Sequence, residues 1–447
     1  MKAALVFLLL VSTACAQTRD EVVAAMKKAA TFFHTKCSSH GGYVYYLAPD
    51  FSWRRGEGKA TADQIFVQPP GTPAVGLAYL RAFEATGDKF YLDAAREAAE
   101  ALVYGQLASG GWMQTIDFAP AKDGRVGKYR NGKGGSWDNS SFDDGISQGA
   151  LRLVMQADRA LKFQHKAIHE AAEFGRKTML DAQFSHGGIP QTWTAQPVAA
   201  TKPVKASYPA AEVHVKNYWD MPTLNDDIAL FFADAMQDGL EIYKDERCRA
   251  ALVKLGDFLI LAQMPEPQPA WAQQYDLEMH PMWARKFEPP AITSRESMTA
   301  IDILLRVNKL TGDKKYLEPI PRALAWLKRS LLPDGRLSRY YELKTNKPIY
   351  MTEDNKLTYD DTNVAQHYGW KIDSRIAEFE KPTTPAKPDV QKILRELDAE
   401  GRWVTTATDE MRLVGNPKFK PGTQFIASEV FNKNLEALSG YVAKPAR

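Results

Sequence analysis

Cysteine is scarce in this chain, which has three in 447 residues: Cys15, Cys37 and Cys248. No two of them are spaced as a Cys-x-x-Cys pair, which excludes the common zinc and thiol redox motifs. Cys37 and Cys248 stand far apart, and the sequence leaves open whether they are two buried thiols or one disulfide. Cysteine chemistry therefore gives no functional site here.

Long hydrophobic runs are also missing, except at the start of the chain. Lys2, the apolar stretch 3–11 and the small residues Ala14-Cys15-Ala16 are typical of a signal peptide. The apolar stretch is too short to span a bilayer. We therefore expect cleavage after Ala16, a secreted or periplasmic protein, and no membrane span in the mature chain.

An excess of one charge is missing as well. The 57 Lys and Arg nearly balance the 54 Asp and Glu, for a net charge of +3, and no basic stripe stands out. This balance argues against nucleic acid as the main partner. Aromatic residues are plentiful, with 10 Trp and 18 Tyr. Most such rings belong to a large core, although carbohydrate-binding clefts also use them against sugar faces.

One phrase recurs along the chain: Gln, a short turn with glycine, then an aromatic or apolar residue. Its clearest copies are 106–112, with Gly110-Gly111-Trp112, and 183–189, with Gly187-Gly188-Ile189; others are 40–43, a Pro-rich variant at 263–271, and a decayed copy at 332–336. The copies recur about every 70–80 residues, which indicates a repeated supersecondary unit.

Helical patterns lie between the copies and come in pairs. The segments are 74–85 with 88–104, 146–161 with 167–180, 228–243 with 249–261, and 297–310. The phrase Thr86-Gly87-Asp88-Lys89 recurs as Thr311-Gly312-Asp313-Lys314. We expect an all-α fold, an α/α toroid of helical hairpins with long loops such as 117–141 and 195–216. The toroid is assigned to residues 17–382, and 383–447 to a C-terminal helical appendage with a helix at 389–400.

Acidic residues open two of these helices. Phe142-Asp143-Asp144-Gly145 precedes one, and Leu224-Asn225-Asp226-Asp227 precedes the corresponding helix one repeat later. Helix capping explains a single such pair. A second copy favours chemistry, either oxygen ligands for a hard cation or an acid/base pair at a glycosidic bond. The spacing does not decide between these uses.

Arginine and aromatic residues form two later clusters. The first includes Tyr275, Arg285 and the run Arg295-Glu296-Ser297, and the second is 336–342, with Arg339 and Tyr341. Arginine forks bind carboxylates in a bidentate manner, so such a cleft suits an acidic sugar polymer. The alternative is surface ion pairing, for example of Arg285 with Glu288.

Taken in order, these phrases resemble the pectic acid lyases, which are the family 10 polysaccharide lyases. The resemblance covers about residues 60–372. It rests on the segments 110–112, 187–191, 142–145, 224–227, 274–276, 285–289, 339–343 and 345–350, which look like the family's phrases in the family's order.

The resemblance implies a secreted pectate lyase, which cleaves polygalacturonate by calcium-assisted β-elimination. It implies that Asp143 and Asp226 hold Ca²⁺ or position substrate, with Asp144 as a further metal ligand. Arg339, together with Asp226, would be catalytic, with Arg339 as the base. Arg285 would bind a substrate carboxylate. The aromatic residues expected to contact substrate are Tyr275, Tyr341 and Trp112. A monomer is expected, with an acidic polysaccharide as its partner.

Some positions depart from the family's pattern. Asp144 stands where the family has Asn, Ile146-Ser147 stand where it has Ala-Thr, and Glu353 lies where it tends to carry an Arg. These differences favour the lyase class more than pectate itself as the substrate. Two rival functions remain: a toroidal glycoside hydrolase using Asp143 with Asp226, and a non-catalytic glycan-binding protein on the same scaffold.

Overall fold

The computed structural model describes residues 18–119, 125–364, 369–381 and 386–443. The expected signal peptide, with Cys15, lies outside this part of the chain. The helices are α1 (Arg19–Phe32), α2 (Thr72–Thr86), α3 (Lys89–Gly105), α4 (Ile146–Ala160), α5 (Lys166–Asp181), α6 (Ile228–Tyr243), α7 (Glu246–Ala262), α8 (Ser294–Thr311), α9 (Pro319–Arg329), α10 (Ile376–Glu380), α11 (Val390–Arg395) and α12 (Ser428–Val442). The helical hairpins expected from the sequence are confirmed. No helix among the described residues is long and apolar enough to cross a membrane.

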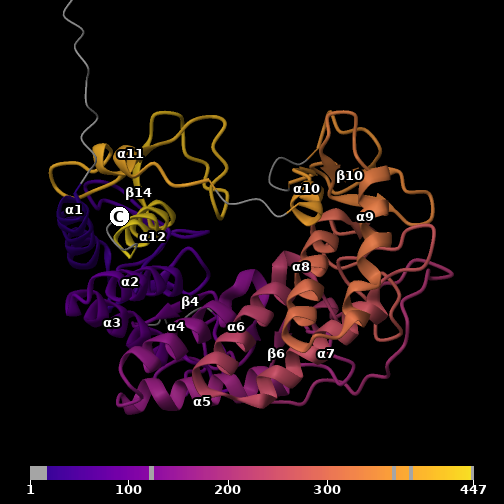
Figure 1. Ribbon diagram of the computed structural model, residues 1–447, viewed down its shortest axis with the longest axis horizontal. Helices are drawn as coiled ribbons and strands as arrows, with labels where there is room; N and C mark the ends of the chain where they lie inside the picture. Colours follow the sequence, from indigo (N-terminus) through magenta and orange to yellow (C-terminus); the bar gives the residue numbers. More distant parts are fainter. Residues whose placement is uncertain (1–17, 120–124, 365–368, 382–385, 444–447) are drawn as a thin grey trace, which may run out of the picture.

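The hairpins follow one another along an arc (Figure 1). One row of neighbours is α2, α4 and α6, and a second row is α3, α5 and α7, with each helix packed on the next in its row. The recurring Thr-Gly-Asp phrase makes the tight connection inside a hairpin. Gly87 and Gly312 both have φ of 74°, and the carboxylates of Asp88 and Asp313 each accept a backbone N–H bond two residues later.

The recurring glutamine joins neighbouring hairpins. The Gln106 side chain donates to the carbonyls of Gly110 and Ala171, at 3.0 Å each. Gln183 repeats this with Gly187 and Ala251, and Gln263 with Pro269 and Pro319. The first glycine of the phrase, two residues before the aromatic or apolar residue, must also be small and left-handed. Gly110 has φ of 96°, and a Cβ there would lie 2.1 Å from the Thr178 hydroxyl on α5. The repeated phrase is therefore a joint between units.

Short strands pair segments of the long loops with one another. They are β1 (Tyr46–Leu47), β2 (Arg54–Arg55), β3 (Gln64–Phe66), β4 (Thr115–Asp117), β5 (Ser140–Ser141), β6 (Thr192–Trp193), β7 (Ala291–Thr293), β8 (Leu337–Ser338), β9 (Tyr340–Glu342), β10 (Pro348–Met351), β11 (Leu357–Thr358), β12 (Lys371–Ile372), β13 (Val404–Thr406) and β14 (Gln424–Ala427). They form sheets in the orders β13-β14-β1-β2, β11-β10-β9-β7, β12-β8, β3-β4 and β5-β6. The β5–β6 pair, with Ser140 opposite Trp193, joins the loops of two successive hairpins.

The C-terminal segment is built into the first repeat. Helix α12 packs against α2 and α1, and β14 pairs antiparallel with β1. The Phe431 ring stacks on Phe33 at 3.9 Å between centroids and meets Tyr79 edge-on. The segment 383–447 is expected to form an appendage, but its described part, 386–443, contributes to the main hydrophobic core. The helix expected at 389–400 is shorter, because Asp398 accepts backbone bonds from Glu400 and Arg402 in a turn.

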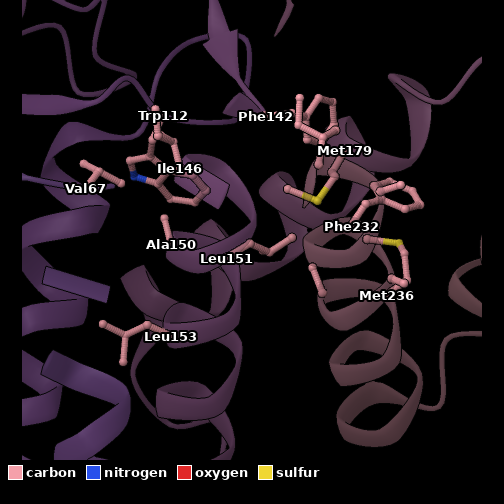
Figure 2. Close-up of a cluster of buried hydrophobic side chains, with 14 of the residues drawn as sticks. Val67, Trp112, Phe142, Ile146, Ala150, Leu151, Leu153, Met179, Phe232 and Met236 are labelled. Atoms are coloured by element: carbon pink, nitrogen blue, oxygen red, sulfur yellow. The ribbon is translucent and has the colours of Figure 1, made fainter. Parts of the chain in front are cut away.

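The core runs between the rows of helices. Figure 2 shows the α4 side chains of Ile146, Ala150 and Leu151 between Trp112 on one side and Phe232 of α6 on the other. Trp112 is fully buried, and its indole N–H donates to the carbonyl of Leu102 at 2.8 Å. Cys37 and Cys248 are both buried and free, which settles the question of a disulfide in favour of two separate thiols.

Candidate active site

Two matching turns bring the acidic residues to the starts of α4 and α6. They are the 3₁₀ turns η2 (Asp143–Gly145) and η4 (Asn225–Asp227), which contact each other. Asp144 and Asp226 occupy equivalent positions with left-handed φ of 50° and 48°. Such a conformation costs about 1–3 kcal/mol for a residue with a side chain and is often found at functional sites.

The capping alternative for these acids is wrong. Neither α4 nor α6 has a side-chain hydrogen bond at its N-cap, whose positions are occupied by Gly145 and Asp227. The two strained turns instead aim carboxylates at one another. One oxygen from each of Asp143, Asp144 and Asp226 lies within 4.8 Å of the others. The repeat thus places acids from two successive hairpins in one cluster, which we call the acid cluster.

Arginine side chains surround the Asp226 end of this cluster. Arg285 donates to Asp226 Oδ2 at 3.0 Å, the Arg339 guanidinium lies 3.5 Å from Asp226 Oδ1, and the Arg295 guanidinium lies 3.9 Å from the same oxygen. The amide of Asn225 also donates to Asp226. The expected convergence of Asp226, Arg285 and Arg339 is present in the structure, and Arg295 joins them.

Two buried glutamates hold these arginines in place. Glu288 accepts from Arg285 Nε at 2.8 Å and from its terminal nitrogen at 2.6 Å, so the ion pair considered in the sequence is present, although Glu288 is buried and the pair is not a surface one. Glu296 accepts from Arg339 at 3.4 Å, and its side chain is fully buried. Both pairs fix the direction of a guanidinium toward Asp226. The side chains of Arg285 and Arg295 remain 29% and 37% exposed, so solvent and ligands reach them, whereas Arg339 is only 4% exposed.

The acid cluster carries more negative charge than its surroundings readily stabilise. Burial raises the pKa of Asp144 to about 8, and the carboxylates of Asp226, Asp143 and Glu57 contribute to the rise. Burial and Asp226 also raise the pKa of Asp143 to about 6, although Arg285 opposes this. The side chain of Gln68 donates to Asp144 at 3.1 Å. A raised pKa means that protons compete with a cation for these carboxylates, but the repulsion between the ionised carboxylates, which contributes to the rise, is what a bound divalent cation would relieve.

The residues present fit a calcium ion. Calcium prefers oxygen ligands from carboxylates, carbonyls and water, and the acid cluster supplies carboxylates from both turns. Asp143 Oδ1 is buried and has no hydrogen-bond partner among the described residues. A buried carboxylate oxygen without a donor is costly unless a cation occupies that side. Asp143, Asp144 and Asp226 are therefore the residues that would hold the ion.

The aromatic residues expected to contact substrate are in the core. Trp112, Tyr275 and Tyr341 are each at most 1% exposed. The Tyr275 hydroxyl donates to the carbonyl of Ala262 at 2.7 Å, and that of Tyr341 donates to the carbonyl of Ser330. The prediction that these three rings contact substrate is wrong, because they are buried in the packing of the recurring turns and a sugar does not reach them. Glu353 lies exposed in the turn between β10 and β11.

Several residues near the acid cluster are not among those predicted from the sequence. Gln68 lies just after β3. Its side-chain amide donates to Asp144 and also to Glu57, which belongs to a different loop. Tyr218 and Trp219 belong to η3 (Tyr218–Asp220), in the long Pro-rich connection before α6. No local pattern marks these positions. Arg295 stands in a named cluster, but only the first turn of α8 brings it to Asp226.

Replacing Asp144 with asparagine should stabilise the metal-free protein at alkaline pH. The raised pKa means that the folded state holds a proton that the unfolded chain releases, so stability falls as pH rises from about 4 to about 8. Asparagine removes this penalty. We expect a gain of about 3 kcal/mol near pH 9 in chelator and almost none near pH 4.

Urea unfolding at the two pH values measures this effect. The exposed Glu353→Gln variant is the matched control and should behave like the parent at both. A D144N variant that is less stable than the parent at alkaline pH would show that the Asp144 carboxylate is stabilised in its ionised form.

Comparison with known proteins supports the resemblance. Residues 122–338 match the sequence model of the pectic acid lyase family. The resemblance to the pectic acid lyases is thereby confirmed. The matched stretch contains the acid cluster, Arg285 and Arg295, and it ends directly before Arg339. No curated protein matches the sequence.

Solved structures with a similar arrangement come from several enzyme classes. Cellobiose 2-epimerase from Bacillus thermoamylovorans is 13% identical, with a TM-score of 0.51 over 95% of this chain and 99% of the epimerase. A mutant family 10 polysaccharide lyase from Cellvibrio cellulosa, in complex with trigalacturonic acid, is 15% identical, with a TM-score of 0.47 over 67% and 93%. The GH76 α-mannanase of Bacteroides thetaiotaomicron is 12% identical, with a TM-score of 0.45 over 96% of both chains. At such identities the epimerase match concerns the fold alone.

Proposed function

We propose that this protein is an exported polysaccharide lyase, which cleaves polygalacturonate or a related uronate polymer by calcium-assisted β-elimination. The observation that carries the proposal is the convergence of the acid cluster with Arg285, Arg295 and Arg339. It is supported by the family match, which covers all of these residues except Arg339. We further propose that the hairpins form an α/α toroid, that the acid cluster lies in its cleft, and that the protein acts as a monomer.

Elimination on a uronate needs a base for the C5 proton, positive groups beside the carboxylate, and departure of the glycosidic oxygen at C4, and the cluster offers groups for the first two. The C5 proton is only weakly acidic, because its removal adds a second negative charge to a carboxylate group that is already anionic. Positive groups must therefore stabilise that carboxylate in the transition state. The partly exposed guanidiniums of Arg285 and Arg295 are placed to bind it. The electron pair of the C5–H bond then forms the C4–C5 double bond, the C4–O bond breaks, and the departing oxygen takes a proton from water.

Proton removal is assigned to Arg339. Its guanidinium is nearly buried and lies between Asp226 and Glu296. These two carboxylates favour the protonated guanidinium, so Arg339 needs a change in its surroundings before it accepts a proton. A calcium ion on Asp143, Asp144 and Asp226 would supply that change by neutralising Asp226, and it would also neutralise the substrate carboxylate.

The surroundings of Asp226 argue against the hydrolase alternative. A glycosidase needs two carboxyl groups that flank the glycosidic bond, one of them acting as the acid. In the acid cluster, the carboxylates of Asp143, Asp144 and Asp226 lie together, and Asp226 is paired with Arg285 and Arg339. A shared cation accounts for this crowding better than an acid and a nucleophile on opposite sides of a bond.

The protein should generate unsaturated uronate ends from polygalacturonate when calcium is present. We expect the ultraviolet absorbance of this product to rise with calcium and to fall at least about tenfold with excess chelator, because the metal contributes transition-state charge. Measuring reducing ends in the same samples separates the alternatives. Reducing ends without absorbance would mean hydrolysis, and retention on a pectin column without product would mean a binding protein.

A further inference from the structure

A cavity of about 430 Å³ lies between the loop after β6 and the η3 turn, and backbone hydrogen bonds connect its wall to Phe142, the residue before Asp143. Its volume falls within the range of about 300–1,000 Å³ that is usual for small-ligand sites. Its lining includes Asn139, Trp193, Gln196, Trp219 and Asp220. We propose that this cavity is a subsite for an uncharged sugar unit of the polymer, next to the uronate that is cleaved. The inference rests on the proposed function.

Trp219 supplies a surface suited to a sugar ring. Its side chain is 37% exposed, in contrast to the fully buried Trp112 and Trp271. Tyr218 packs against it edge-on, with 5.2 Å between the ring centroids. An aromatic ring that is held from behind and open in front binds the apolar face of a sugar at little entropic cost.

The backbone connects this platform to the acid cluster. The Trp219 carbonyl accepts from the Gln191 amide at 3.0 Å, and the Gln191 carbonyl accepts from the Phe142 amide at 2.9 Å. Phe142 directly precedes Asp143. On the other wall, Asn139 stands four residues before Asp143, so their Cα atoms are at most about 14 Å apart. A chain of a few sugar units is long enough to span this distance.

The chemistry of the lining selects against a carboxylate. Asn139 and Gln196 offer amides, and the threonines of the loop offer hydroxyls, which suit sugar hydroxyl groups. Asn139 Oδ1 is buried and lacks a hydrogen-bond partner among the described residues. Asp220 is the charged side chain of the lining, and no described lining residue is Lys or Arg. The acid cluster, by contrast, is surrounded by arginines. A uronate would therefore bind there, whereas the cavity would take a neutral sugar or an esterified uronate.

Trp219→Ala tests the subsite on three polymers: fully acidic polygalacturonate, its methyl-esterified form, and a polymer in which galacturonate alternates with a neutral sugar. We expect kcat/KM to fall about tenfold on whichever of the last two occupies the cavity, and less than about twofold on the fully acidic polymer. Trp219→Phe should recover most of the loss. Phe163→Ala is the control, because this exposed ring follows the far end of α4.

Asp220→Asn tests the charge preference separately. Removing this carboxylate should raise kcat/KM on the fully acidic polymer several-fold, with little change on the alternating one. Equal losses on all three polymers in Trp219→Ala, or no loss on any, would overturn the proposed subsite while leaving the lyase function intact. Quenching of tryptophan fluorescence by neutral oligosaccharides provides an assay without catalysis. If no polymer is cleaved but Trp219→Ala abolishes that quenching, the lyase function fails and the subsite stands.

Discussion

Replacing Arg339 should lower the kcat of elimination by about a thousandfold or more, because its guanidinium is assigned to the proton transfer and lies against Asp226. The simple variant carries a structural risk. Glu296 has a fully buried side chain that contacts Arg339, and leaving it without that partner costs about 3–5 kcal/mol. The informative variant is therefore Arg339→Met combined with Glu296→Gln, in which neither side chain is charged.

The measurements are kcat from product absorbance, together with thermal unfolding and near-ultraviolet circular dichroism. Arg306→Met is the control, since Arg306 also pairs with an aspartate but is 53% exposed. A folded double variant that keeps more than about a tenth of the activity would rule out Arg339 as the base. Arg339→Lys refines the result. Lysine carries a positive charge but loses its proton more readily than arginine, so kcat is measured against pH: an unchanged profile would assign Arg339 to charge stabilisation, and a shift of the acid limb to lower pH would support its role as the base.

Replacing Phe431 with alanine should destabilise the whole first repeat, although the residue lies close to the C-terminus. The ring is 2% exposed and contacts Phe33, Tyr79 and Trp403. Removing a buried phenylalanine ring costs about 3–5 kcal/mol. Urea unfolding measures the loss, and Lys433→Ala, on the exposed side of the same helix, should change stability by less than about 0.5 kcal/mol.

Truncation before β14 makes the same point more strongly. It removes the strand beside β1 and the helix that covers α2, so we expect loss of cooperative folding. A truncated protein with the parent's unfolding midpoint would show that α12 contributes nothing to the core.

The helical hairpins were predictable because their signals are local. Apolar spacing within α3 or α6 is visible in one window of sequence, and Gly87 and Gly312 mark the connections by themselves. The strands that tie the loops are two to four residues long and depend on partners far away. Tyr46 pairs with Ala427, but no local sequence pattern near either residue indicates this pairing. For this reason the sequence alone predicts an appendage for the C-terminal segment.

The acid cluster was predictable for a different reason. A repeat places equivalent residues at equivalent positions, so two acidic turns one unit apart were expected to meet. The aromatic residues gave no such guide. Nothing in the residues around them shows that Trp112, after a glycine turn, fills the core, while Trp219, in the Pro-rich connection before α6, is partly exposed. Their difference is set by packing between hairpins, which the sequence does not display.

The pairing of the two ends of the chain bears on how the protein folds during synthesis. Helix α1 is made first, yet the surface on which it rests is completed by α12, about four hundred residues later. Hairpins α4–α5 and α6–α7 have all their partners nearby in the sequence and are able to form while the ribosome is still translating. The first helix must wait, with Val22, Met26 and Phe33 uncovered. We therefore expect the docking of this helix against α12 to be one of the last steps of folding.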